Sequence, residues 1–146
     1  MFKGPDLRRR KPHATTSWPW FIAYLAFVIY GSLVPLNYNG MALDEALRHF
    51  ANIPFLQLGA GSRADWIANG VLYLPLGLLL ARVLRGGLGA STGTAFIGAV
   101  AMCGAVAVAV EFAQLFFPPR TVSQNDLIAE VLGSALGAWL AFVLQP

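Results

Sequence analysis

Seven polar residues in the chain after residue 60 have the types and spacing to form a binding site. They are Asp65, Asn69, Glu111, Gln114, Arg120, Asp126 and Glu130. The carboxylates can orient a ligand or exchange protons with it. The planar guanidinium of Arg120 can hold a phosphate or carboxylate through two parallel hydrogen bonds, and the two amides can bind a headgroup or a sugar.

These polar residues belong to a chain that is otherwise strongly apolar. Of its 146 residues, 57% are hydrophobic and only 12% are charged, whereas soluble domains carry about 25% charged residues. The composition therefore indicates a membrane protein. A carboxylate in hydrocarbon costs about 2.5 to 3.5 kcal/mol, so we expect Glu111 in particular to be paired, protonated or in contact with water.

Four apolar segments are long enough to cross a membrane: residues 18–36, 64–84, 92–117 and 126–144. Between the first two, Leu43, Leu47 and Phe50 share one helical face, which is typical of a short helix lying in the interface. The sequence thus predicts an all-α polytopic membrane bundle of four transmembrane helices plus a short interfacial helix. Residues 18–146 form a single domain, preceded by a basic cytoplasmic tail at 1–17.

Small residues predict how these helices pack. Gly133 and Gly137 lie on one face of the fourth segment and allow another backbone to approach closely. Along the third segment, Gly93, Ile97 and Ala101 form one four-spaced row, and Gly98, Met102 and Ala105 lie close to another. Because small residues let helix backbones approach closely, we expect the third helix to be central.

The distribution of cations predicts the orientation. With four spans, seven of the ten cations fall on the side of the termini: Lys3, Arg8, Arg9, Arg10, Lys11, Arg82 and Arg85. The positive-inside rule then places both termini in the cytoplasm. The seven polar residues consequently converge near the outer surface, where they would form an outward-facing polar pocket.

From residue 64 to 142 the chain resembles the VanZ-like family. The resemblance is carried by Asp65-x3-Asn69 with Pro75-x-Gly77, by Glu111-x2-Gln114, by the loop Pro118-Pro119-Arg120-x2-Ser123-x2-Asp126, and by Gly133-x3-Gly137. One departure is Glu130, where the family usually has Asn. The resemblance implies a multi-pass protein of the bacterial cytoplasmic (inner) membrane with a role in the cell envelope, but it implies no particular reaction.

Three functions fit these observations. The pocket could bind a lipid-linked or glycan headgroup, with Arg120 as the anion clamp. Alternatively, Arg120 neutralises Glu111 or Asp126, Asn69 and Gln114 tie helices together, and the protein is a structural accessory subunit of a larger membrane complex. An enzyme using a carboxylate as acid or base ranks last, because paired carboxylates alone specify no reaction.

The sequence contains little that would bind a metal ion, a cofactor or a nucleic acid. His13 and His49 lack metal-ligand spacing, and Cys103 is the single cysteine. The basic tail precedes a membrane span, so it indicates topology rather than nucleic-acid binding. We expect no metal and no cofactor. The expected partners are membrane lipids, a lipid-linked glycan or other membrane protein subunits.

Overall fold

The computed structural model describes residues 17–55 and 60–144, which form five α-helices and, in those ranges, no strand. The helices are α1 (Trp18–Leu33), α2 (Leu43–Ala51), α3 (Ala60–Arg82), α4 (Thr92–Gln114) and α5 (Gln124–Val143), and a π-helical turn, η1 (Val83–Gly87), follows α3 directly. The basic tail before Ser17 lies outside the described residues.

The helices confirm an all-α, multi-pass membrane protein. Three of the described helical segments are long and apolar enough to cross a membrane: Arg63–Gly87, Thr92–Gln114 and Gln124–Val143. The first predicted span is shorter than expected, because α1 has 16 residues and ends at Leu33 rather than at residue 36. Val34 is extended, as the residue before a proline usually is, and Pro35 therefore stops the helix.

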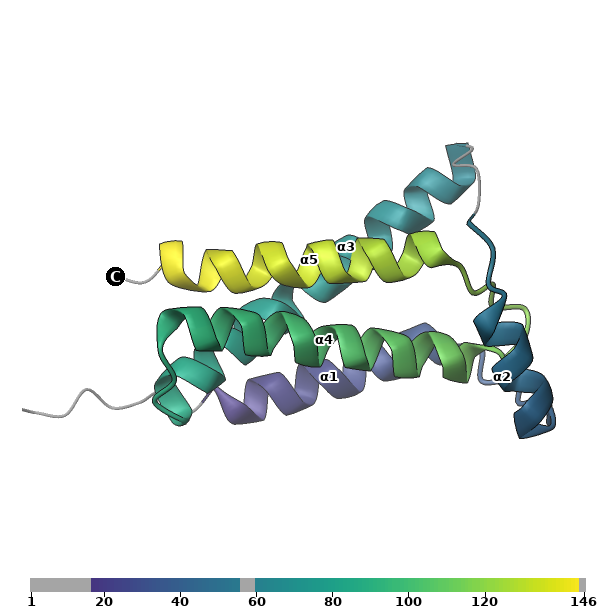
Figure 1. Ribbon diagram of the computed structural model, residues 1–146, viewed down its shortest axis with the longest axis horizontal. Helices are drawn as coiled ribbons and strands as arrows, with labels where there is room; N and C mark the ends of the chain where they lie inside the picture. The colour runs from purple at the N-terminus through teal and green to yellow at the C-terminus, as the bar shows by residue number, and fades with distance from the viewer. Residues whose placement is uncertain (1–16, 56–59, 145–146) are drawn as a thin grey trace, which may run out of the picture.

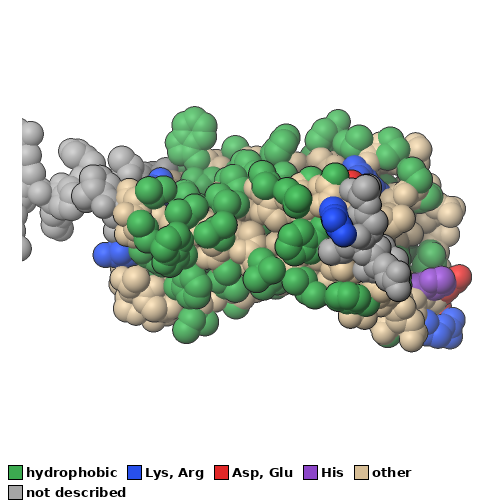
Figure 2. Space-filling model, turned by 90° about the horizontal axis from the view of Figure 1, so that it is seen from above, with side chains coloured by type: hydrophobic (Ala, Val, Ile, Leu, Met, Phe, Trp, Pro, Cys, Tyr) green, Lys and Arg blue, Asp and Glu red, His purple; other side chains and the backbone are tan. Residues whose placement is uncertain are grey.

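The long helices lie roughly along one axis, with α3 crossing the others obliquely (Figure 1). The short helix α2 lies across one end of the bundle, where α1 and α4 end and where α3 and α5 begin (Figure 1). We call this the α2 end, and the opposite end, which holds η1, the η1 end. Hydrophobic side chains cover the middle of the face shown in Figure 2, and charged side chains lie toward its ends.

Helices α3 and α5 are in backbone contact through glycines. Neither Gly133 nor Gly137 has room for a Cβ atom, because the carbonyl oxygens of Gly70 and Leu74 on α3 occupy that space. In the same way, a Cβ on Gly77 would overlap the backbone of α5. The structure thus places Gly133 and Gly137 at the closest helix contact of the described bundle, which suits a membrane interior where association depends on close packing.

Neither of the two rows noted on the third helix forms its buried face. Nothing lies within 4 Å of a Cβ built on Gly93, and Ile97 is 69% exposed. The buried face of α4 instead carries Ala95, Ala99, Cys103 and Ala107. Alanine is small enough to allow close helix contact, so more than one row of α4 could pack closely. The positions of the neighbouring helices α3 and α5 decide that the alanine row is the buried one.

Helix α1 is held to the bundle by polar side chains that bind its backbone carbonyls. Arg120 donates from Nε to the Val34 oxygen at 2.7 Å and from Nη2 to the Gly31 oxygen at 3.0 Å. Gln114 donates from Nε2 to the Ser32 oxygen at 3.0 Å. The last carbonyls of a helix lack partners within it and carry partial negative charge, so a cation is well placed there.

The segments around α2 are joined to the ends of α4 and α5. The Phe50 ring of α2 meets Phe112 of α4 edge-on, with centroids 5.5 Å apart. The Asn39 N–H donates to the Phe116 oxygen at 2.8 Å, and the Gln124 N–H donates to the Pro54 oxygen at 3.1 Å. These contacts fix the loops that surround the polar residues of the α2 end.

The glycine contact predicts a large effect of a single methyl group. We expect Gly137→Ala to destabilise the protein by about 1 to 3 kcal/mol, the usual cost of overpacking, because the new Cβ meets a backbone oxygen that cannot move aside. The matched control is Gly93→Ala, which adds the same atom in open space on α4. Thermal unfolding in detergent measures both, and equal midpoints would contradict the assigned contact.

The contacts of Arg120 predict that lysine cannot replace it, because a single ammonium cannot reach both carbonyl oxygens. We expect Arg120→Lys to speed amide hydrogen exchange at the end of α1 and to lower stability by about 1.5 kcal/mol, the low end for a charged hydrogen bond. The control is Arg48→Lys on α2, where the exposed pair with Asp44 contributes little. Unchanged exchange around residues 31–34 in Arg120→Lys would refute this role.

Candidate functional site

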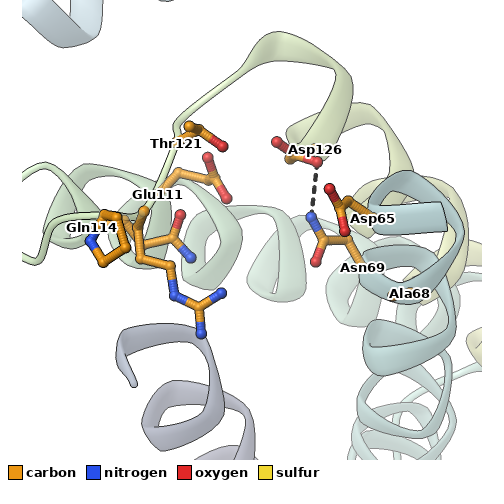
Figure 3. A pocket seen from close by; sticks show the side chains of 9 residues that line it. Asp65, Ala68, Asn69, Glu111, Gln114, Thr121 and Asp126 are labelled. Atoms are coloured by element: carbon orange, nitrogen blue, oxygen red, sulfur yellow. Dashed lines mark hydrogen bonds between the residues drawn. The ribbon is translucent and has the colours of Figure 1, made fainter. Parts of the chain in front are cut away.

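A cavity of about 270 Å³ lies at the α2 end, between the first turns of α3 and α5 and the last turns of α4. Its lining consists of Asp65, Ala68, Asn69, Glu111, Gln114, Pro119, Arg120, Thr121 and Asp126. We call it the polar cavity. Figure 3 shows Glu111 and Gln114 on one side and Asp65, Ala68 and Asn69 on the other, with Asp126 above them. Six of the seven predicted site residues therefore line one cavity.

A hydrogen-bonded wall joins α3 to α5. The Asn69 Nδ2 donates to Asp126 Oδ1 at 2.8 Å, and the Ser123 hydroxyl donates to Asp126 Oδ2 at 2.6 Å (Figure 3 shows the first of these bonds). Ser123 is also the N-cap of α5 and accepts from the Asp126 N–H at 3.3 Å. Asp126 thus sits in the first turn of α5, where the unpaired N–H groups and the helix dipole stabilise a carboxylate.

Glu111 forms the deepest acidic part of the lining. It lies in the last turns of α4 and is 1% exposed. Its Oε2 atom has no hydrogen-bond partner. Buried polar atoms are nearly always hydrogen-bonded, so an unpartnered carboxyl oxygen in a cavity wall calls for a ligand, a water molecule or a proton.

Arg120 does not pair with Glu111 or Asp126, the two acids that the sequence suggested as its partners. Within the described residues no ion pair joins Arg120 to Glu111 or Asp126. Its Nε and Nη2 atoms are engaged by the carbonyls at the end of α1, and Gln114 also donates there. The expectation that Arg120 neutralises an acid is therefore wrong. As an anion clamp, Arg120 has only part of its guanidinium free.

Glu130 and Tyr73 lie outside the lining of the polar cavity. Glu130 is 2% exposed and Tyr73 is fully buried, and both interact electrostatically with Glu111. The Tyr73 hydroxyl and the Glu130 Oε2 have no hydrogen-bond partner. The seventh predicted site residue thus belongs to the interior of the bundle, next to the polar cavity rather than in its wall.

Several lining or supporting residues were not in the predicted set. Ala68 and Thr121 line the cavity, and Ser123 bonds the acid three residues beyond it. The Ser123-x2-Asp126 spacing is a capping signal, so the sequence contained the information for that contact. Among the described residues, no three His, Cys, Asp or Glu side chains are placed to hold a metal ion.

The comparison with known families covers nearly the whole chain. A sequence model described as VanZ/LLP1 matches residues 21–145, so the match extends through α1 and α2 as well as the region that carries the resemblance. No curated protein and no solved structure matches the chain. Together with its long apolar helices, this match shows that the chain belongs to the VanZ/LLP1 family of multi-pass membrane proteins.

Proposed function

We propose that this protein binds the polar headgroup of a membrane lipid or lipid-linked glycan in the polar cavity. The observation that carries the proposal is the convergence of polar side chains from α3, α4 and α5 on one cavity at the end of three membrane-spanning helices. Polar residues are costly at such positions and usually mark a functional site. The VanZ/LLP1 match supports the membrane setting and leaves the ligand open.

The size of the cavity suits a headgroup rather than a whole ligand. Pockets for drug-sized molecules have volumes of about 300 to 1,000 Å³, and the polar cavity has about 270 Å³. A second, apolar cavity of about 230 Å³ lies between α3 and α5, lined by residues that include Trp66, Ile67 and Leu136. The same two helices therefore offer a polar site and an apolar surface, as an amphiphilic ligand requires.

The orientation follows from the charges of the η1 end. We infer that α1 is the fourth crossing, since Trp20, Phe27 and Tyr30 on it are more than half exposed, as lipid-facing side chains are. Arg82 and Arg85 lie at the η1 end, where α1 begins, and five further cations precede α1 in the sequence. The positive-inside rule then puts both termini in the cytoplasm and the polar cavity in the outer leaflet of a bacterial inner membrane.

Cysteine labelling tests this orientation. In a Cys103→Ala background, we expect Asp44→Cys on α2 to react with a membrane-impermeant maleimide in intact cells. Leu88→Cys at the η1 end should react only after the cells are permeabilised. Both positions are exposed in the structure, with an exposed side-chain fraction of 72% for Asp44 and a residue exposure of 65% for Leu88. The reverse pattern would place the cavity in the inner leaflet.

Blocking the cavity tests the binding function. Ala68 lies in the lining, so Ala68→Trp fills the polar cavity. Ala101 on α4 is exposed and lies outside the linings of both the polar and the apolar cavity, which makes Ala101→Trp the matched control. We expect native mass spectrometry of the purified protein to show co-purified lipid on the wild type and on Ala101→Trp, and at least several-fold less on Ala68→Trp.

Equal lipid retention by both tryptophan variants would mean that the polar cavity is not the binding site. Under that outcome a stable association with other membrane proteins in mild detergent would favour an accessory subunit instead. If the protein is monodisperse and Ala68→Trp removes the bound lipid, the accessory-subunit function is excluded.

A further inference from the structure

The hydrogen-bond donors around the polar cavity are mostly used within the protein. Asn69 donates through Nδ2 to Asp126, and Gln114 donates through Nε2 to the Ser32 oxygen. Arg120 donates through Nε and Nη2 to the end of α1. Each of these three side chains thus uses at least one of its donors for a partner within the protein.

The acceptors that line the cavity are left without such partners. The Oε2 atom of Glu111 is buried and unpartnered. The carboxylate of Asp65 lies opposite it in the lining (Figure 3). Because their amide nitrogens donate elsewhere, the amide oxygens of Asn69 and Gln114 also remain as acceptors. Of the acids in the lining, only Asp126 has both carboxyl oxygens engaged.

The charged groups of the lining also favour a cation over an anion. Asp65, Glu111 and Asp126 contribute three carboxyl groups, against the single cation Arg120. Arg120 also faces the partial negative charge at the end of α1, which offsets part of its own field. A phosphate in the centre of the cavity would therefore meet more acids than donors, whereas a cation with several N–H donors would find partners for all of them.

We propose that the polar cavity selects the primary ammonium of an amine-bearing headgroup, with Asp65 and Glu111 as the groups that bind it; this inference rests on the proposed function and names its ligand class. An ammonium carries three donors and no acceptor. It pairs the buried Glu111 carboxylate, which would otherwise be an uncompensated charge. The guanidinium nitrogen Nη1 of Arg120 is not used in the bonds to α1, and it would bind a phosphate attached to the same headgroup.

Binding of short-chain lipids to the full-length protein in detergent tests the ligand class. We expect dihexanoyl-phosphatidylethanolamine to bind at least about tenfold more tightly than the phosphatidylcholine and phosphatidylglycerol analogues, as the loss of a hydrogen bond to a charged group implies. The choline headgroup keeps the positive charge and lacks the N–H donors. Soluble O-phosphoethanolamine distinguishes a lipid headgroup from a free amine.

Two substitutions in the cavity test the assigned residues. Glu111→Gln keeps the size of the side chain and removes its charge, and Asp65→Asn lies at an exposed position that should not affect folding. Each should weaken binding of the ethanolamine lipid by about tenfold or more. The control Glu45→Gln removes an acid from exposed α2, outside the polar cavity, and should leave binding unchanged. If Glu111→Gln does not accumulate, Asp65→Asn carries the test.

The outcomes separate this inference from the proposed function. Equal affinity for ethanolamine and choline lipids, or tighter binding of the glycerol lipid, overturns ammonium selection. Lipid retention that is sensitive to Ala68→Trp would still support a headgroup site in that case. If O-phosphoethanolamine binds as tightly as the ethanolamine lipid, ammonium selection stands and the lipid origin of the ligand is overturned.

Discussion

The backbone contact between α3 and α5 is the constraint on which the rest of the structure depends. Gly133 and Gly137 bring the two helices so close that neither position can hold a side chain. At that spacing Asn69, in the third turn of α3, reaches Asp126, in the first turn of α5, at 2.8 Å. The close contact therefore builds one wall of the polar cavity, and α4 supplies the opposite wall with Glu111 and Gln114.

Lipid as solvent explains why the interior and the surface are composed as they are. Large apolar side chains such as Trp20 and Ile97 point outward, while the first turns of the buried face of α4 carry small residues such as Ala95 and Ala99. No hydrophobic force drives helices together in hydrocarbon, so small residues and interhelical hydrogen bonds perform that role. The same environment makes each unpaired polar atom costly. The buried oxygens of Tyr73, Glu111 and Glu130 that lack a hydrogen-bond partner are thus the exceptions among the described residues.

The sequence predicted the helices better than their contacts. Hydropathy and length are local properties, so the apolar segments and the amphipathic helix around Leu47 could be placed, although Pro35 ended α1 earlier than expected. The polar residues that meet in the cavity could be grouped because helix ends at one side of a membrane lie at one depth. The packing face of α4 could not be predicted, because small residues surround the whole helix. Only the neighbouring helices decide which row is buried.

The partners of Arg120 lay beyond sequence reasoning for a different reason. Its acceptors are backbone carbonyls of Gly31 and Val34, 89 and 86 residues earlier in the chain. Backbone groups carry no signature in the sequence, whereas acids do, so Glu111 and Asp126 were the visible candidates. Because Arg120 is engaged at the end of α1, acceptors outnumber free donors in the lining, and the proposal of an ammonium ligand rests on that excess.

The most direct test of this account is a density map of the protein in nanodiscs containing phosphatidylethanolamine. We expect headgroup density in the polar cavity, with its nitrogen within hydrogen-bond distance of Glu111 and Asp65, while Arg120 stays on the carbonyls of α1. A map in which Arg120 has left α1 and pairs with Glu111, with no headgroup beside them, would contradict the account.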